Sequence, residues 1–121
     1  FGHVNNVIYY RYIENARLYY LDHLKILQQD VLTVIASNQC KYIRPVVYPD
    51  ILKIGVRVEE LRNSAMRMHY LIYSEVQQMV VAEADAVIVC VDCVNMQKTL
   101  IPENVRVGIH KIEKTVQHIL D

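Results

Sequence analysis

Glycine and proline are scarce in this sequence, with three residues of each among 121. Three scattered glycines exclude a P-loop and a dinucleotide-binding fingerprint, because both motifs place several glycines close together around a phosphate. The sequence also has no G-x-S-x-G pentapeptide, which argues against a serine hydrolase with a nucleophile elbow. No two histidines have the spacing of a zinc-binding pair. We therefore expect neither a metal nor a bound cofactor.

An excess of positive charge and a long hydrophobic run are also missing. Thirteen basic residues balance thirteen acidic ones, whereas a protein that binds a phosphate backbone needs a basic excess. No window approaches the roughly 18 uncharged apolar residues of a membrane span, and no secretory signal is visible. With 53% hydrophobic residues, the sequence predicts one soluble domain over residues 1–121, without nucleic acid or a membrane as partner.

The cysteines are odd in number, and they have no second pair. Cys90 and Cys93 have a C-x-x-C spacing, but they follow a valine-rich strand pattern instead of preceding a helix. A structural zinc site needs four ligands, so ordinary thiols are the simpler interpretation, and a zinc or redox site is the alternative. Together with Cys40, these reduced thiols indicate a cytoplasmic protein.

The first 27 residues predict a turn followed by a long helix. Gly2 permits a tight turn, and Asn5 or Asn6 can cap the helix after it. Apolar residues then recur mostly at steps of three and four, which marks one buried helical face: Tyr9, Tyr12, Ile13, Ala16, Tyr20, Leu24 and Leu27. A helix of roughly 20 residues is about 30 Å long, enough to cross a small domain. We predict that this helix is the centre of the core.

After this helix the residue patterns favour strands. Four segments have such patterns: Val31–Ile43, a stretch from Ile51 to the turn at 62–64, Ala65–Ser74 and Met79–Asp92. In the last strand, Ala82, Ala84 and Ala86 share one face, and we expect these small side chains to lie against the long helix. The opposite face of the sheet mixes charged and apolar side chains, as subunit contacts often do: Arg57, Arg67, Val81, Glu83, Asp85, Val87 and Val89.

A second helix closes the chain. Pro102 suits its first position, and apolar residues repeat along it: Val105, Ile109, Ile112, Val116 and Ile119. The whole pattern predicts an α+β fold in which an antiparallel sheet wraps around one long central helix, with an additional C-terminal helix.

The N-terminal stretch resembles one family of enzymes. The matching residues are Gly2-His3-Val4-Asn5-Asn6, then Tyr9, Tyr12, Glu14 and Ala16-Arg17. The chain here resembles the hotdog-fold acyl-CoA thioesterases of the 4-hydroxybenzoyl-CoA thioesterase family, for which this loop and helix are fairly specific. The resemblance continues over nearly the whole chain, at Tyr42-x-x-Pro45, Asp50-x-Leu52, Val81-Ala82-x-Ala84 and Ile101-Pro102-Glu103.

The resemblance implies a hotdog fold and the hydrolysis of a fatty or aromatic acyl-CoA to the free acid and coenzyme A. It also implies a homodimer whose sheets join edge to edge, with active sites at the interface, and dimers that pair further into tetramers in some members. In the family a catalytic aspartate stands just before the loop, which places it two residues ahead of Phe1. The family's first strand precedes that aspartate, so the domain in residues 1–121 is expected to be N-terminally incomplete.

A thioester carbonyl needs its oxygen polarised. Free N–H groups at a helix start, with the helix dipole behind them, provide this. Our hypothesis is that the backbone N–H of Asn6, with that of Val7, faces the carbonyl; the alternative is that Asn5 and Asn6 only cap the helix. His3 either orients the missing carboxylate or the attacking water, or holds the loop by a hydrogen bond.

The remaining candidate residues are expected to bind the substrate. Tyr9 is nearest the helix start and is a candidate for the acyl group, although tyrosines at helical spacing are usually core residues. The candidate catalytic residues are His3, Asn5 and Asn6, and the candidate substrate-binding residues are Gly2, Val4, Val7 and Tyr9.

No carboxylate within the chain is an obvious substitute for the family's aspartate. Glu14 lies more than two turns into the helix, where we expect it to pair with Arg17 or the facing strand, and Asp50 is an ordinary turn residue. The phosphates of coenzyme A are candidates to meet cationic side chains, although a solvated surface is the simpler interpretation for each: Arg62, Arg67 and Lys98.

Two other functions stay open. A hotdog hydratase would need an aspartate and a histidine facing one site across a longer loop than His3-Val4-Asn5-Asn6. A non-catalytic hotdog module would bind an acyl-CoA, or serve only in assembly, without turnover.

Overall fold

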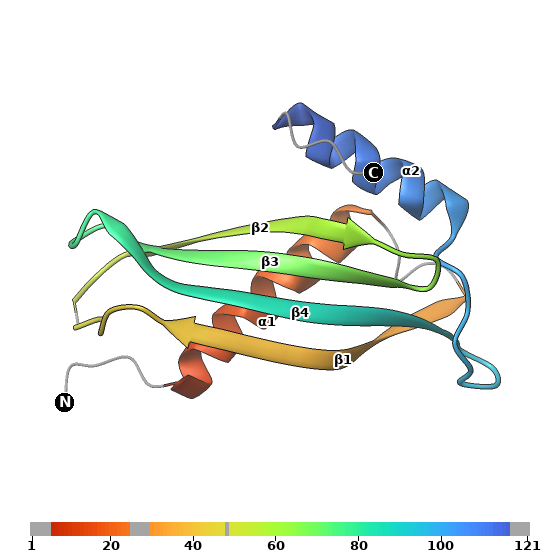
Figure 1. The fold of residues 1–121 in the computed structure, drawn as a ribbon, viewed down its shortest axis with the longest axis horizontal. Coiled ribbons are helices and arrows are strands. Elements are labelled where there is room, and N and C mark those ends of the chain that lie inside the picture. Colours follow the sequence, from red (N-terminus) through yellow and green to blue (C-terminus); the bar gives the residue numbers. More distant parts are fainter. Residues whose placement is uncertain (1–5, 25–29, 48, 117–121) are drawn as a thin grey trace.

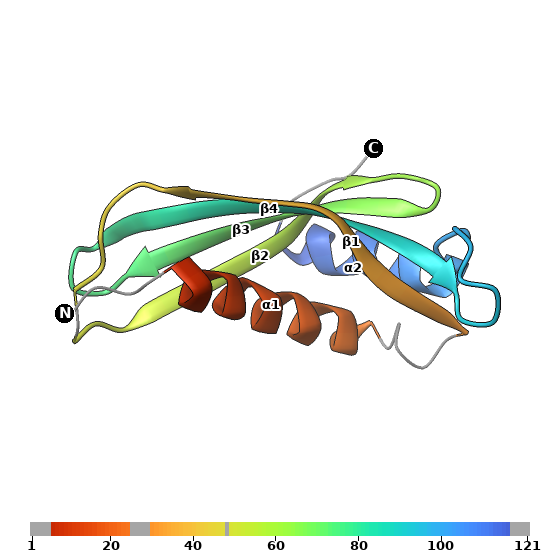
Figure 2. The same ribbon diagram turned by 90° about the horizontal axis from the view of Figure 1, so that it is seen from below.

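The computed structural model describes the backbone at residues 6–24, 30–47 and 49–116, and within these ranges the side chains from residue 11 onward. The elements are α1 (Asn6–His23), β1 (Val31–Tyr42), β2 (Leu52–Leu61), β3 (Ala65–Ser74), β4 (Met79–Asp92) and α2 (Glu103–Thr115). The four strands form one sheet in the order β1-β4-β3-β2, and all neighbours pair antiparallel. Helix α1 lies across one face of this sheet (Figures 1 and 2). The predicted α+β architecture is confirmed.

The strands form where the residue pattern alternates. On β3, alternate side chains are fully buried, namely Met66, Met68, Tyr70 and Ile72. Between them Arg67 and His69 point to the opposite face, as the alternation predicts. The turn predicted at residues 62–64 joins β2 to β3, where the backbone N–H of Arg62 donates a 2.8 Å hydrogen bond to the carbonyl of Ala65.

Helix α1 packs through the predicted apolar stripe. Ile13 is completely buried and Tyr20 is nearly so, whereas Leu21, which the predicted stripe omits, is also buried. The most extensive backbone contacts of α1 are with β2. Residue 27, the last of the predicted stripe, lies outside the described residues.

The alanine row of β4 faces the core, as predicted. Ala82, Ala84 and Ala86 are at most 2% exposed and belong to the same buried cluster as Ile13 on α1. Val81, predicted on the polar face, is instead fully buried. Ile72 of β3 pairs with Ala82 of β4, but Tyr73 pairs with Val80, so Val81 lies at an irregularity in the pairing. Such an irregularity interrupts the alternation of buried and exposed side chains along β4.

Helix α2 lies beside β2 at the end of the chain (Figure 1). Val105 and Ile109 are completely buried, and Ile112 packs against the core as predicted. Val116, expected to continue the stripe, is 69% exposed because the helix ends at Thr115. Its place on the buried face is taken by Glu113. None of the described helices is long and apolar enough to cross a membrane.

Candidate active site at the start of the long helix

The predicted site lies where α1 begins. The helix starts at Asn6, so the hypothesis of a helix start at this residue is confirmed. The first N–H groups of any α-helix lack partners within the helix and carry the positive end of its dipole. The backbone of Asn6, Val7 and Tyr9 thus belongs to the first turn of α1. Such a turn can polarise a carbonyl oxygen or bind an anion.

Most of the predicted site lies outside the part that the structure describes. Gly2, His3, Val4 and Asn5 are outside the described residues, and the side chains of Asn6, Val7 and Tyr9 are not described either. Their predicted roles in catalysis and substrate binding therefore stay predictions.

A buried arginine lies on the same helix as the predicted site. Arg17 is only 6% exposed, and its Nη1 lies 3.5 Å from the hydroxyl of Tyr70 on β3, to which it donates. Burial raises the pKa of Tyr70, and the nearby Arg17 opposes that rise. The expectation that Glu14 is a buried partner of Arg17 or of the facing strand is wrong, because Glu14 is exposed. Arg17 is instead buried beside Ile13 and Leu21.

The tyrosines of α1, which the helical spacing predicts to be core residues, differ in burial. Tyr20 is a core residue, whereas Tyr19 is 80% exposed. Tyr12 and Tyr19 border a groove of about 340 Å³ beside β2, whose wall on that strand includes Leu52 and Ile54. The interpretation that helically spaced tyrosines belong to the core thus holds for Tyr20 and not for Tyr19.

The candidate phosphate contacts lie near one another, but two of them are already paired with carboxylates. Arg62 and Lys98 line one hollow of about 530 Å³ at the turn between β2 and β3, together with Ser64. Arg62 already forms two hydrogen bonds to Glu60, of 2.9 and 3.0 Å. Arg67 pairs with Asp85 at 3.0 Å, and its Nε also lies 3.6 Å from Oε2 of Glu60, the oxygen that Arg62 bonds. The structure therefore brings Arg62 and Lys98 to one hollow, and Glu60 joins Arg67 to Arg62.

The described residues include no group of three or more His, Cys, Asp and Glu side chains that could hold a metal ion. Cys90 is buried and Cys93 is exposed, and both are free thiols. Burial raises the pKa of Cys90, which makes its thiol a poor nucleophile.

One buried polar cluster escaped the sequence analysis. The carboxylate of Glu113 on α2 is 1% exposed and accepts a hydrogen bond from the hydroxyl of Tyr20 on α1. The sequence did indicate that Glu113 is buried. It falls four residues after Ile109 and eight after Val105, which places it on the apolar face of the helix.

Comparison with known families decides which group of proteins this arrangement represents. A family model described as the thioesterase-like superfamily matches residues 1–109. The chain belongs to the thioesterase-like superfamily. The matched range includes residues 1–5, helix α1, the whole described sheet and the first half of α2.

Two bacterial proteins are similar to this chain in sequence. The chain is 37% identical over 73 residues to the uncharacterised protein YsmA of Bacillus subtilis, a match that covers 59% of this chain and half of YsmA. It is 30% identical over 104 residues to the long-chain acyl-CoA thioesterase FadM of Escherichia coli, covering 83% of this chain and 78% of FadM.

A solved thioesterase confirms the fold. The structure of a thioesterase from Thermus thermophilus, complexed with coenzyme A and Zn, superposes with a TM-score of 0.81 at 29% identity, over 93% of this chain and 83% of that chain. The predicted hotdog fold, an antiparallel sheet around a long helix, is therefore confirmed.

Proposed function

We propose that the protein hydrolyses acyl-CoA thioesters to a free acid and coenzyme A. The observation that supports the proposal is the family match over residues 1–109, a range that contains both the Gly2-His3-Val4-Asn5-Asn6 sequence and helix α1. The likeness to FadM, a long-chain acyl-CoA thioesterase, favours a fatty acyl group. The likeness to a thioesterase solved with coenzyme A favours the CoA part of the substrate.

In the proposed mechanism the N–H groups of Asn6 and Val7 bind the carbonyl oxygen of the thioester. They stabilise the negative charge that develops on that oxygen when water attacks the carbonyl carbon. The resemblance implies a catalytic aspartate two residues before Phe1, which would attack the carbonyl or act as the base. In this mechanism His3 orients that carboxylate or the attacking water. The thiolate of coenzyme A leaves and takes up a proton.

A homodimer joined at β1 accompanies this proposal. β1 lies at one end of the sheet order, and among the described residues it pairs with β4 alone and has no strand along its other edge. Leu32, Val34 and Ile35 on this strand are 39–47% exposed. A long, apolar open edge is prone to pair with another strand, and pairing β1 with its copy would cover it. The three free cysteines, Cys40, Cys90 and Cys93, favour a cytoplasmic location.

Thiol release from a panel of acyl-CoAs of increasing chain length tests the function. The full-length protein should release one thiol for each substrate consumed, detected with a chromogenic thiol reagent. Cys93 is exposed and reacts with such a reagent, so the assay uses the Cys93→Ser variant, or subtracts the thiols of the protein alone.

The same assay separates the alternatives. A non-catalytic module would bind acyl-CoA, detected by calorimetry, and release no thiol. A hydratase would consume an enoyl-CoA while leaving the thioester intact. Either result would contradict the proposed hydrolysis.

A further inference from the structure

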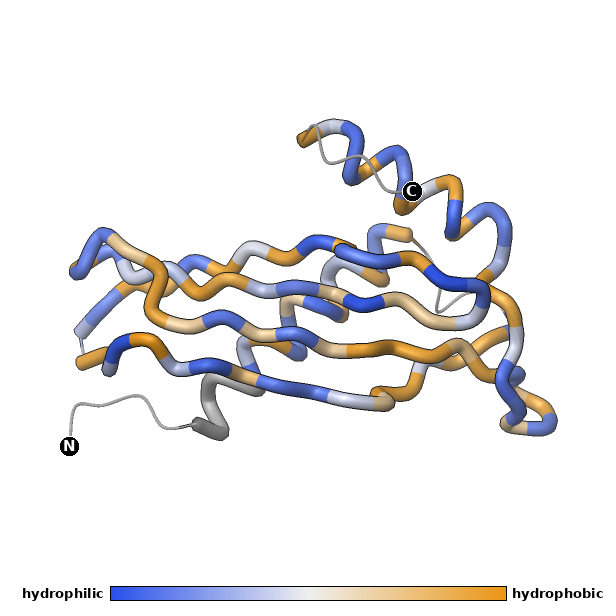
Figure 3. The backbone as a smooth tube through the Cα atoms, in the orientation of Figure 1, coloured by the Kyte–Doolittle hydropathy of each residue, from blue (hydrophilic) through white to orange (hydrophobic). Residues whose placement is uncertain are grey.

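One end of the molecule combines exposed apolar side chains with positive charge. The turn that joins β4 to α2 projects beyond the end of the sheet at which α2 begins (Figures 1 and 2). In this segment Val94 is 89% exposed, Met96 58% and Leu100 67%. Figure 3 shows hydrophobic and hydrophilic positions side by side in the turn. Three apolar side chains of one short segment are thus in contact with solvent.

Hydrogen bonds hold this turn in a defined conformation. The N–H of Asp92 donates to the carbonyl of Gln97 at 2.7 Å, and the N–H of Met96 donates to the carbonyl of Asp92 at 2.8 Å. Oδ1 of Asp92 accepts a further bond from the N–H of Val94 at 2.8 Å. An ordered turn loses little entropy when it binds a partner, so its exposed apolar side chains are already placed for a contact.

Cationic side chains gather behind this turn. Lys98 and Leu100 line a hollow of about 530 Å³ together with Arg62 from the turn between β2 and β3. Arg106 reaches the same place from α2, because its Nη2 donates to the carbonyls of Arg62, at 2.7 Å, and Asn63, at 3.2 Å. Two turns and the first half of α2 therefore bring three cations to one end of the sheet.

Two of these three cations have no acidic partner among the described residues. Arg62 bonds to Glu60, whereas neither Lys98 nor Arg106 forms an ion pair within the described part of the chain. Glu103, the exposed acidic residue at the start of α2, pairs with neither of them. The hollow behind the turn thus keeps a positive charge that can attract an anion.

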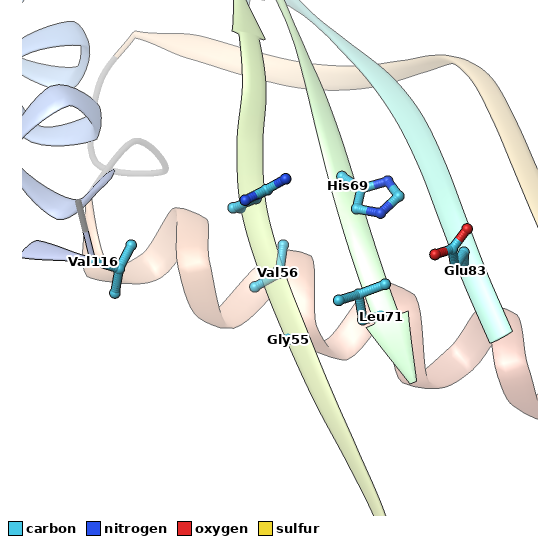
Figure 4. Close-up of a pocket in the computed structure, with 7 residues that line it drawn as sticks. Gly55, Val56, His69, Leu71, Glu83 and Val116 are labelled. Carbon is cyan, nitrogen blue, oxygen red and sulfur yellow. The ribbon is translucent and has the colours of Figure 1, made fainter. Parts of the chain in front are cut away.

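A second hollow, of about 420 Å³, lacks this positive excess. Arg57 and His69 line it together with Glu83 (Figure 4). Nε of Arg57 donates a 2.5 Å hydrogen bond to Glu59, and Nδ1 of His69 lies 3.1 Å from Oδ1 of Asp85. Its basic groups therefore have carboxylate partners within the chain, which makes the end of the molecule the better site for an anionic ligand.

We propose that one patch at this end of the molecule docks on the surface of a membrane that contains anionic lipids. The end patch consists of Val94, Met96, Lys98, Leu100 and Arg106. Its apolar side chains enter the boundary between headgroups and acyl chains, and its cations lie at the level of the headgroup phosphates. An acidic protein would pair with the cations but would need an additional apolar pocket for the projecting turn. An anionic lipid surface provides both contacts.

Docking of this kind uses exposed side chains and needs no spanning helix. It would revise the expectation, drawn from the lack of a long hydrophobic run, that a membrane is not a partner. Vesicle binding is measured without substrate. A protein that hydrolyses acyl-CoA without docking, or docks without hydrolysis, therefore separates this proposal from the proposed function.

The first experiment is cosedimentation of the full-length protein with vesicles of phosphatidylglycerol and phosphatidylcholine in equal amounts. The wild type should bind these vesicles, bind vesicles of phosphatidylcholine alone far less, and dissociate as sodium chloride is added. Lys98→Glu should weaken binding by at least about tenfold, because it reverses one charge of the end patch. A wild type that stays in the supernatant would overturn the proposal.

Lys53→Glu is the matched control for this charge reversal. Lys53 is an exposed lysine at the start of β2, at the opposite end of the sheet, and its exposed pair with Glu75 contributes little to stability. The control should bind the vesicles as the wild type does, and circular dichroism shows whether both variants are folded. Equal losses of binding in the two folded variants would contradict a role of the end patch.

Fluorescence gives an independent readout of the apolar contact. The sequence contains no tryptophan, so Val94→Trp provides one reporter in the turn. Its emission should shift to shorter wavelength when anionic vesicles are added. Tyr19→Trp is the control, because Tyr19 is 80% exposed on α1, and its emission should not shift. Emission from position 94 that stays unchanged with bound vesicles would overturn the proposed insertion.

Soluble anions distinguish the other possible occupants of the end patch. Coenzyme A and polyglutamate are each titrated into the wild type and into Lys98→Glu, without vesicles. The proposal predicts that neither binds the wild type more tightly than it binds the variant. A soluble anion whose binding depends on Lys98, with no binding of anionic vesicles, would assign the patch to that anion and overturn the membrane contact.

Discussion

The hydroxyl of Tyr20 on α1 donates a 2.5 Å hydrogen bond to Oε2 of Glu113 on α2. The backbone N–H of Val58 on β2 donates to the same oxygen at 3.3 Å. Tyr20 is 6% exposed and Glu113 1%, and the second oxygen of Glu113 is buried without a hydrogen-bond partner among the described residues. One buried carboxylate thus joins α1, β2 and α2.

Removing the hydroxyl of Tyr20 should destabilise the fold. Tyr20→Phe leaves the buried Oε2 of Glu113 with only the bond from Val58, and an acceptor that loses a partner costs about 1–3 kcal/mol. Urea unfolding measures the change in the free energy of unfolding. Tyr19→Phe is the matched control, since Tyr19 is 80% exposed, and it should change this free energy by less than about 0.5 kcal/mol. Equal effects of the two substitutions would contradict the importance of the Tyr20 bond.

The same tyrosine should make the protein sensitive to alkali. Burial, followed by the hydrogen bond and negative charge of Glu113, raises the pKa of Tyr20 above its ordinary 10.0. As the pH rises, Tyr20 loses its proton in the unfolded chain before it does so in the folded protein. The stabilisation that the protonated hydroxyl provides is therefore complete below pH 10. Above pH 10 the free energy of unfolding falls by about 1.4 kcal/mol per pH unit. The free energy of unfolding, measured from pH 8 to 11, should fall less steeply in Tyr20→Phe. Parallel curves for the two proteins would refute this.

Asp50 should contribute stability at neutral pH and lose it in acid. Its carboxylate accepts hydrogen bonds from the Ser74 hydroxyl and from the N–H groups of Ile51, at 2.7 Å, and Val76, at 3.1 Å. The Ser74 bond is the main reason that the pKa of Asp50 lies below 3.8. A lowered pKa means that the contribution is present above this pH and declines as the pH falls. We expect Asp50→Asn to lower the melting temperature at pH 7, and the difference from the wild type to shrink toward pH 3. A difference in melting temperature that grows toward pH 3 would contradict the stabilising role of the Asp50 carboxylate.

The cysteines should differ in reactivity. Cys93 is exposed, whereas burial raises the pKa of both Cys90 and Cys40 and so lowers their thiolate fraction. Iodoacetamide at pH 8, followed by mass spectrometry, should modify Cys93 first and Cys90 only after unfolding. A disulfide between Cys90 and Cys93 in the isolated native protein would instead support the redox interpretation.

Strands and the closing helix could be predicted because their patterns are local. The alternation along β3 and the alanines of β4 each determine which face is buried, and the structure agrees. Val81 was misplaced because the irregularity between β3 and β4 arises from pairing of distant segments, which no local pattern records. Leu21 was omitted from the predicted apolar stripe but is buried, because the buried face of α1 is wider than the stripe of residues that recur at steps of three and four.

The interior polar contacts were harder to predict. Glu14 and Arg17 are three residues apart on α1, a spacing that suggests an ion pair, yet Arg17 turns inward to Tyr70. Glu113 was overlooked because an isolated glutamate in an amphipathic helix is usually solvated, and only the tertiary fold brings Tyr20 and Val58 to it. The start of α1, by contrast, could be predicted from the two asparagines themselves, because asparagine is a good helix cap. The helix begins at Asn6, as expected.

The rate of thiol release from a long-chain acyl-CoA by the full-length protein is the most direct test. We predict turnover by the wild type, a loss of roughly tenfold or more in His3→Ala, and an unchanged rate in the control His110→Ala, whose residue is exposed on α2. Tight binding of the acyl-CoA with no thiol released by the wild type would contradict the proposed hydrolysis.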